Sequence, residues 1–445
     1  MTAVAVPGED AYAHATEVFN LANPPRPVAA LTARTVEDVA TALAFAREGG
    51  LPVRVHTTGH AAGAARPMNG SLLIRTELAG GVEIDTARRL ARIPAGTRWG
   101  AVVDAATPHG LTAVHGSAAS VGVVGYLLGG GLSFYGRQHG LGVNSVRAIE
   151  LVIADGTPIR VDADTDAELF WAVRGGGGGF GVVTAVEVEL FPVTMVMTGA
   201  AYFPAEHAEA LLRTWLTWTR DAPPEVSTSL RFMNLPAAPN VPDVLAGVST
   251  VCVDGAALDA AAAQDLLGAL RSVAGPVLDT WAETGAAAVL DAHMDPDRPM
   301  PVVGDHLLLD ELDDAALTQL LRVLGPGSGS PLIAAGFRQL GGAYATSVPH
   351  GGVLDHVTAR FSYAGSGVPM GGVTGAELRE RCDLVRASLA PWDTGSTLPS
   401  FVEHFGQPQR HLGPASIVAI DRVRGQVDPA GFFRGDIAPG ATALS

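Results

Sequence analysis

The chain has 445 residues, of which 47% are hydrophobic and 17% charged. That composition is typical of a globular protein with a well-buried core, and the length suits two domains. A formal net charge of −16 would repel a phosphate backbone, so nucleic acid is not an expected partner. No apolar run is long enough to cross a bilayer, and two cysteines cannot form a disulfide framework.

The first elements in chain order alternate between helix and strand. Thr35 precedes a run with apolar residues at helical spacing and acidic residues in the first turn, which predicts a capped helix over 35–47. Residues 52–56 then read as a short strand that leads into a loop ending at His60. Further strands are predicted at 72–74, 82–85, 90–94 and 148–153.

The first half of the chain contains three glycine-containing segments, at 56–61, 115–131 and 174–181. Glycine lets backbone amides approach a ligand closely, so three such segments favour main-chain contact with a pyrophosphate. The third segment formally satisfies G-x-G-x-x-G, but it follows a helical run at 167–173 and leads into a strand at 182–190. A Rossmann loop follows a strand and opens a helix, so this interpretation is rejected.

In this order, residues from about 25 to 193 resemble the flavin-binding domain of the vanillyl-alcohol oxidase and p-cresol methylhydroxylase superfamily, within its berberine-bridge-enzyme-like branch. The resemblance implies FAD as cofactor and assigns residues to it. The first loop contributes His56, Thr57, Thr58, Gly59, His60 and Ala61. The second contributes His115, Gly116, Ser117, Val121, Gly122, Gly125 and Tyr126, and the third Gly181 and Val183.

The resemblance makes His60 the covalent anchor of the flavin, because relatives carry Arg-Ser-Gly-Gly-His where this chain has residues 56–60. A neutral imidazole is a competent nucleophile near neutral pH, whereas the alternative is a turn histidine bonded to backbone. Bicovalent relatives also carry a cysteine where this chain has Ala118. Cys252 and Cys382 fall in other regions and are expected to be small buried apolar residues. We therefore expect a flavin tethered through His60 only.

The expected fold is α+β with two domains. The main part of the FAD-binding domain takes residues 1–195, a substrate domain of sheet and helices takes 196–400, and residues 401–445 return to the FAD-binding domain. In the family, the second domain covers the isoalloxazine ring and supplies the substrate pocket. Within it, the pattern predicts a helix over 258–270 and a strand over 357–363.

Flavin oxidation of an alcohol or amine needs a base near the proton released. Relatives often carry a Tyr-x-Gly-x-Asn element near the flavin, and its tyrosine and asparagine are absent at 411–415. The candidate bases are Tyr344, Tyr363, Glu403 and His404, although either tyrosine could be an ordinary strand residue. Tyr126 is expected to pack on the flavin, and His350 is a weaker pocket candidate. No H-E-x-x-H or C-x-x-C suggests a metal.

These observations predict a cytoplasmic FAD-linked oxidase or dehydrogenase. The resemblance implies that it oxidises an apolar small molecule of secondary metabolism by hydride transfer to flavin N5, with dioxygen as acceptor. Two alternatives remain open. One is a flavin-bearing cyclase or isomerase without net redox change, and the other is a flavin binder without chemistry.

Overall fold

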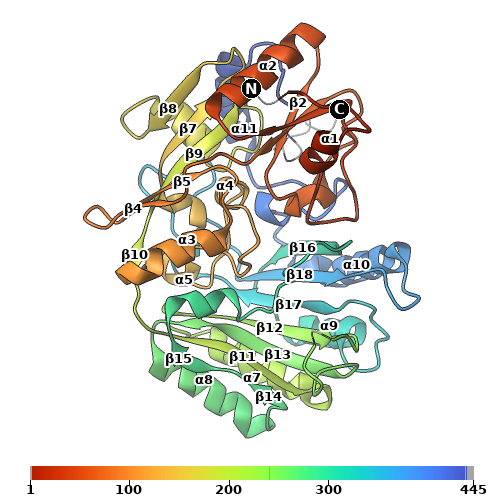
Figure 1. Cartoon of the computed structure of the whole chain (residues 1–445). Coiled ribbons are helices and arrows are strands. Elements are labelled where there is room, and N and C mark those ends of the chain that lie inside the picture. Colours follow the sequence, from red (N-terminus) through yellow and green to blue (C-terminus); the bar gives the residue numbers. More distant parts are fainter. Residues whose placement is uncertain (1–2, 240, 436, 438–445) are drawn as a thin grey trace.

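The computed structural model describes residues 3–239, 241–435 and 437. Figure 1 shows two layered parts, with both ends of the chain in the upper one. The expected two-domain α+β fold is confirmed. In the part of the chain that the structure describes, no helix is both long and apolar enough to cross a membrane.

The upper part contains two main sheets. A parallel sheet has the strand order β1–β3–β2, formed by Ala29–Ala33, Leu72–Thr76 and Val53–His56. An antiparallel sheet has the order β4–β5–β9–β7–β8, formed by Glu83–Asp85, Leu90–Pro94, Val182–Glu189, Val146–Val152 and Pro158–Asp162. The short strands β6 (Leu111–Thr112) and β10 (Phe191–Pro192) pair separately.

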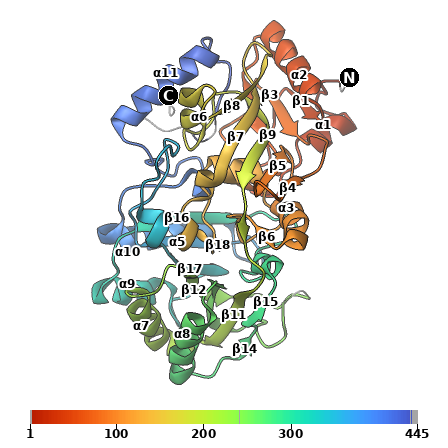
Figure 2. The ribbon, with the colours of Figure 1, turned by 90° about the vertical axis from the view of Figure 1, so that its left-hand side faces the viewer.

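Helices surround these sheets. They are α1 (Asp10–Ala15), α2 (Val36–Gly49), α3 (Trp99–Ala106), α4 (Val123–Leu128), α5 (Gly136–His139), α6 (Ala167–Val173) and α11 (Pro414–Val427). Helix α2 begins as predicted, because Thr35 and Asp38 form a reciprocal capping box. Helix α11 lies beside α6 in Figure 2, where Arg422 bonds Glu168. The end of the chain thus returns to the upper part.

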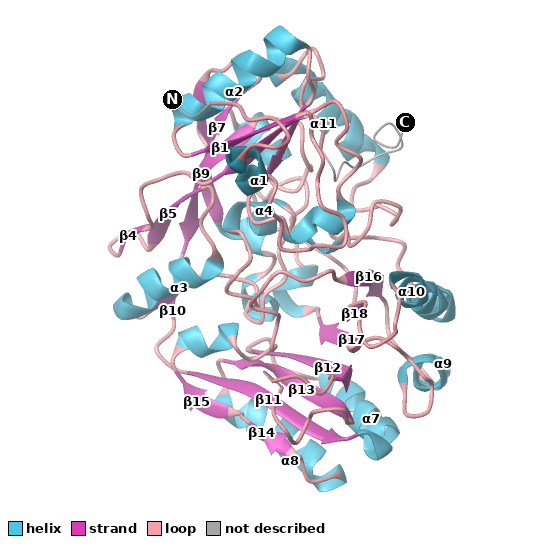
Figure 3. Ribbon diagram, turned by 45° about the vertical axis from the view of Figure 1, so that its right-hand side comes forward, coloured by secondary structure: helices cyan, strands magenta, loops and turns pink. Residues whose placement is uncertain are grey.

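The lower part is built on a larger antiparallel sheet with the order β14–β11–β13–β12–β17–β18–β16, and β15 pairs with β11. The strands are Leu278–Asp279, Val196–Pro204, Ser249–Ala257, Val226–Asn234, Ala334–Gln339, Phe361–Gly367 and Val303–Leu309, with β15 at Ala282–Thr284. The chain enters this sheet between β10 and β11 (Figure 3). The predicted boundaries at 195 and 400 stay predictions.

Four helices gather on one side of that sheet, α7 (Ala208–Thr219), α8 (Ala260–Val273), α9 (Asp314–Leu324) and α10 (Gly375–Leu389) (Figure 2). Period-two alternation sends apolar strand residues such as Leu230, Val253 and Phe337 into the core beneath the helices. Their chain neighbours Arg231, Asp254 and Arg338 consequently point to the opposite face.

One predicted strand begins later than expected. The pattern placed it at 357–363, whereas β18 starts at Phe361. Arg360 instead donates its backbone N–H to Leu309 O and accepts from Leu340 N as the chain turns into the sheet. The apolar residues Val357 and Ala359 are buried in a small cluster between the two parts. Their alternating pattern therefore comes from burial in a loop and not from a strand.

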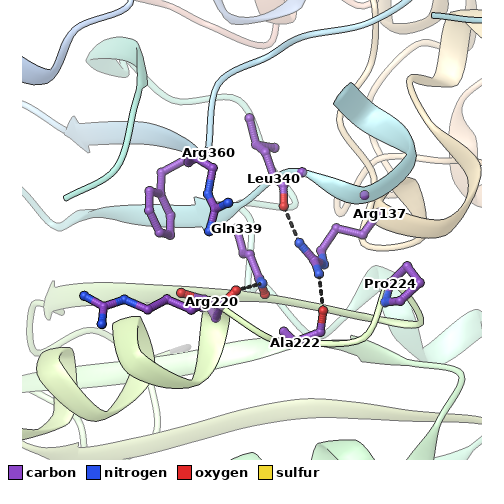
Figure 4. Close-up of a pocket in the computed structure, with 11 residues that line it drawn as sticks. Arg137, Arg220, Ala222, Pro224, Gln339, Leu340 and Arg360 are labelled. Carbon is purple, nitrogen blue, oxygen red and sulfur yellow. Dashed lines mark hydrogen bonds between the residues drawn. The ribbon is translucent and has the colours of Figure 1, made fainter. Parts of the chain in front are cut away.

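Arg137 ties the two parts together. It lies in α5 of the upper part, yet its guanidinium donates to the backbone carbonyls of Ala222 and Leu340 (Figure 4) and to that of Val226. Arg137, Ala222 and Leu340 line a cavity of about 250 Å³. Because Gln339 in its wall bonds Thr219 of α7, the cavity lies on the helix-covered side of the sheet and not on the face where Arg338 points.

We expect Arg137→Met to destabilise the fold by about 3 kcal/mol, because it leaves several buried carbonyls without a donor. Urea unfolding measures the loss. Arg220→Met is the matched control, since that exposed side chain lines the same cavity, and its effect should stay within about 0.5 kcal/mol. Equal losses for both variants would contradict the structural role of Arg137.

Candidate functional site

His60 lies at the start of a short 3-10 helix, directly after a left-handed glycine. Gly59 has φ +69°, and a Cβ there would lie 2.5 Å from Val18 Cγ1, so only glycine fits this turn. Backbone bonds from Phe19 N to Thr58 O (2.9 Å) and from Asn20 N to Gly59 O (3.2 Å) fix the loop. The Phe19 ring then stacks on the imidazole at 3.9 Å between centroids.

Both nitrogens of His60 have hydroxyl partners. Nδ1 lies 2.7 Å from Thr58 Oγ1, and Nε2 lies 3.2 Å from Ser120 Oγ. The pKa of His60 is lowered to about 4, chiefly by burial and also by the charge of Arg98, while Asp295 opposes both effects. The imidazole is therefore neutral at pH 7, which is the protonation state that a nucleophilic nitrogen needs.

His56 has a different environment, although it is only four residues away. Its Nε2 lies 2.9 Å from Ala15 O, which ties the end of β2 to α1. Thr57 Oγ1 lies 2.7 Å from Thr76 Oγ1 on the neighbouring strand. These two members of the predicted cofactor set thus hold the loop in place, and the exposed Ala61 follows them in the 3-10 helix.

The second predicted segment meets the first. A Cβ on Gly122 would lie 3.2 Å from Thr57 Cγ2, so the two loops are in contact. Val121 O accepts from Trp99 N at 3.0 Å, which holds this segment against α3. The exposed Gly125 has open space beside it, since outside its own helix no atom of the described residues lies within 4 Å of a Cβ there. The two loops therefore form one surface with room for a ligand.

His115 and Tyr135 leave buried polar atoms without partners at this surface. His115 Nδ1 lies 2.6 Å from Gly116 O, whereas its Nε2 has no partner among the described residues, and the Tyr135 hydroxyl has none either. Burial lowers the pKa of His115 to about 4, so this ring is neutral. Unpaired buried polar groups are costly, and a polar ligand such as a flavin would supply their partners. Tyr126 packs its ring between Gly116 and Gly131.

The third segment is covered by other parts of the chain. Arg424 of α11 donates to the carbonyls of Gly176 and Gly178. A Cβ on Gly181 would lie 2.7 Å from Val152 O, so close packing of β9 on β7 already requires this glycine. Val183, next to it, is a half-buried residue of β9. Neither residue needs a cofactor to explain its place in the chain.

Two of the four proposed bases have no route to a substrate. The Tyr344 hydroxyl donates to Ser133 O (2.6 Å) and accepts from Ser133 N (2.8 Å), and burial raises its pKa to about 12. Tyr363 points into the core beneath the helices, where burial raises its pKa well above the usual value. Both predictions are wrong, because tertiary packing consumes one hydroxyl and encloses the other. His350 is exposed, with its carbonyl bonded by Arg174.

The other two lie beside the first loop. A Cβ on Gly63, three residues after His60, would clash with the carbonyl oxygen of Glu403. The Glu403 carboxylate points toward Gly304 on β16, and burial, with a smaller contribution from Asp305, raises its pKa to about 7. His404 is half-buried in the same loop. Their assignment as bases stays a prediction.

The raised pKa of Glu403 predicts a pH-dependent stability. Between about pH 4.5 and 7 the folded protein binds more protons at this group than the unfolded chain, so the free energy of unfolding falls as the pH rises. Glu403→Gln should therefore gain about 1 to 2 kcal/mol over the wild type at pH 8 and little at pH 5. Urea unfolding at both pH values measures this difference. The exposed Glu380→Gln is the control, and the same gain there would contradict the assignment.

A polar cluster on the second sheet was missed. The register places Asp254, Ser229 and Arg338 side by side across β13, β12 and β17. Arg231, two residues along β12, bonds Asp254 Oδ2, and His293 Nδ1 lies 3.1 Å from Asp254 Oδ1. Burial alone would raise the pKa of Asp254, but Arg231 and His293 outweigh it and hold that pKa well below its usual range.

This cluster reaches the first two loops through the segment after His293. Asp295 Oδ2 accepts from Ser117 Oγ at 2.6 Å, and its charge acts on His60. His293 Nε2 has no hydrogen-bond partner among the described residues. The sequence did carry a signal, since Arg231, Asp254 and Arg338 are each the single charged residue of their strand, β12, β13 and β17. A buried carboxylate–imidazole pair with a free nitrogen is an arrangement suited to accepting a proton.

The fold and the loops define the class of protein. Residues 27–162 match the family described as FAD binding domain, and the whole chain has the fold of berberine bridge enzyme-like flavoproteins. The structure of berberine bridge enzyme from Eschscholzia californica matches with a TM-score of 0.79 at 16% identity, covering 99% of this chain and 97% of that one. For 6-hydroxy-D-nicotine oxidase from Arthrobacter nicotinovorans the TM-score is 0.81 at 23% identity, covering 98% and 96%.

Sequence relatives match over part of this chain. FAD-dependent monooxygenase prx3 of Penicillium roqueforti is 32% identical over 231 residues, 52% of this chain and 44% of the relative. (R)-6-hydroxynicotine oxidase of Paenarthrobacter nicotinovorans is 38% identical over 160 residues, 36% of this chain and 35% of the relative. The alignments thus span less than half the length of these relatives. FAD is the cofactor that this domain family binds.

Proposed function

We propose that the protein is an FAD-dependent oxidoreductase that takes a hydride from a small organic substrate, with dioxygen as the acceptor. The observation that carries the proposal is the neutral imidazole of His60, held between Thr58 and Ser120 in a loop of an FAD-binding domain. The relatives named above include an oxidase and a monooxygenase, and both activities consume dioxygen.

We propose further that His60 alone attaches the cofactor. The first two loops fit FAD, because they offer an unpartnered His115 Nε2 and open space at Gly125. Ala118 in the second loop cannot form a thioether. Cys252 and Cys382 are buried in the lower part, away from either loop. When bound, FAD supplies a two-electron acceptor at N5.

The proton released by the substrate needs an acceptor, and we assign this role to His293. Asp254 bonds the Nδ1 side of the ring, which leaves Nε2 free to take a proton from a hydroxyl or amine. The carboxylate then stabilises the imidazolium that forms. Arg231 holds the second oxygen of Asp254 and also bonds His293 O at 2.9 Å, so the pair keeps its orientation.

Anaerobic mixing with a panel of alcohols, secondary amines and oligosaccharides tests this function. We expect at least one substrate to bleach the flavin absorbance, oxygen to restore it, and the product to have lost two hydrogens. Turnover without bleaching would indicate a redox-neutral cyclase or isomerase. A flavin that no compound reduces, with no turnover, would indicate a binder without chemistry. Either of these results would overturn the proposal.

A further inference from the structure

Arg338 on β17 is a buried cation with no carboxylate partner. Arg338 is only 9% exposed. No carboxylate of the described residues comes within 4.0 Å of its guanidinium. Its bonds run to Ser229 Oγ and Leu132 O, both at 3.4 Å, which is long for a hydrogen bond. Five guanidinium donors are therefore poorly used.

Two other buried arginines, Arg137 and Arg231, are better satisfied, and so is the part-buried Arg386. Arg231 pairs with Asp254, and Arg386 donates to both oxygens of Asp305, at 2.9 and 2.5 Å. The Arg137 guanidinium donates hydrogen bonds to backbone carbonyls. A buried charge without a counter-charge costs free energy, so Arg338 needs an external anion more than these residues do.

The position of Arg338 shows where such an anion would sit. The guanidinium carbon lies 4.2 Å above the ring centroid of Phe134, and the edge of the same ring meets His293 at 5.7 Å. Phe134 follows the glycines at 129–131 of the second loop. Arg338 and His293 therefore flank one aromatic ring on the sheet face opposite the helices.

We propose that Arg338 binds a carboxylate of the substrate and that the substrate is a small organic acid, not the neutral apolar molecule expected from the sequence. The planar fork of a guanidinium matches both oxygens of a carboxylate. In this arrangement Arg338 holds the anion, and the hydroxyl or amine to be oxidised meets His293, which contacts the same Phe134 ring. The inference rests on the proposed function.

Benzoate is the probe, with benzamide as its neutral isostere. Each is titrated into the flavin-loaded protein, and the shift in flavin absorbance and the calorimetric heat are recorded. We expect benzoate to bind the wild type more tightly than benzamide. Arg338→Met should weaken benzoate binding about 10- to 100-fold, as loss of a charge-assisted hydrogen bond predicts. The affinity for benzamide should not change. Arg338→Lys should restore part of the affinity, which a misfolded variant could not do.

Three results would overturn the inference. They are equal binding of benzoate and benzamide, no benzoate binding at all, and unchanged benzoate affinity in Arg338→Met. A lower flavin midpoint potential in that variant with unchanged benzoate affinity would place the guanidinium against the cofactor instead. Arg220→Met, an exposed arginine on the helix-covered side, is the matched control.

The test is separable from that of the proposed function. If neutral substrates alone bleach the flavin, the carboxylate site fails while the oxidase function stands. If benzoate binds through Arg338 but no substrate reduces the flavin, the anion site stands while the oxidase function fails.

Discussion

His60→Ala should abolish the covalent attachment of flavin completely, because the proposed tether runs through His60 alone. After acid precipitation, the wild-type pellet should stay yellow, and that of the variant should be colourless with all FAD in the supernatant. The neutral state of His60, set mainly by burial, is what makes the ring reactive near pH 7.

His56→Ala is the matched control for this experiment. His56, the last residue of β2, also has a pKa lowered to about 4 by burial, but its Nε2 bonds Ala15 O. The control should retain acid-stable flavin. Flavin that is released from the wild type by acid would show that His60 is a cradle residue only, and acid-stable flavin in His60→Ala would place the tether elsewhere.

Asp254→Asn should have the largest effect on stability. The substitution leaves Arg231 buried without its counter-charge and removes the carboxylate beside His293. Breaking a buried ion pair from one side costs about 3 to 5 kcal/mol, measured by urea unfolding. The anaerobic rate of flavin reduction should also fall, by about 100-fold, which is typical for loss of a general base.

A double variant separates these two effects. Replacing the pair by apolar side chains, in Arg231→Met with Asp254→Leu, removes both charges, so most of the lost stability should return. The reduction rate should not return, because His293 still lacks its carboxylate. A double variant that recovers both stability and rate would contradict the role assigned to the Asp254 and His293 pair.

The flavin-binding half was predictable because its signals are local. The capping box at Thr35 and Asp38 lies within four residues, and the Gly59–His60 turn depends on a single left-handed position. The helix, loop and strand order around 167–190 also follows from periodicity along the chain. Such features need no knowledge of distant segments.

The assignments of Tyr344 and Tyr363 failed for the opposite reason. Tyr344 meets Ser133 across 211 positions of sequence, and no local pattern reports that contact. Arg338, Ser229 and Asp254 become neighbours only through strand register. The alternation that puts Tyr363 into the helix-covered core depends on which face each strand presents, and single-strand patterns do not show this.

The most direct test of the whole account is the absorbance spectrum of the purified protein, before and after incubation with FAD. We expect flavin absorbance with one FAD per chain. A protein that stays colourless after that incubation would contradict it, since the neutral His60, the unpartnered His115 and the open space at Gly125 would then have no flavin to explain them.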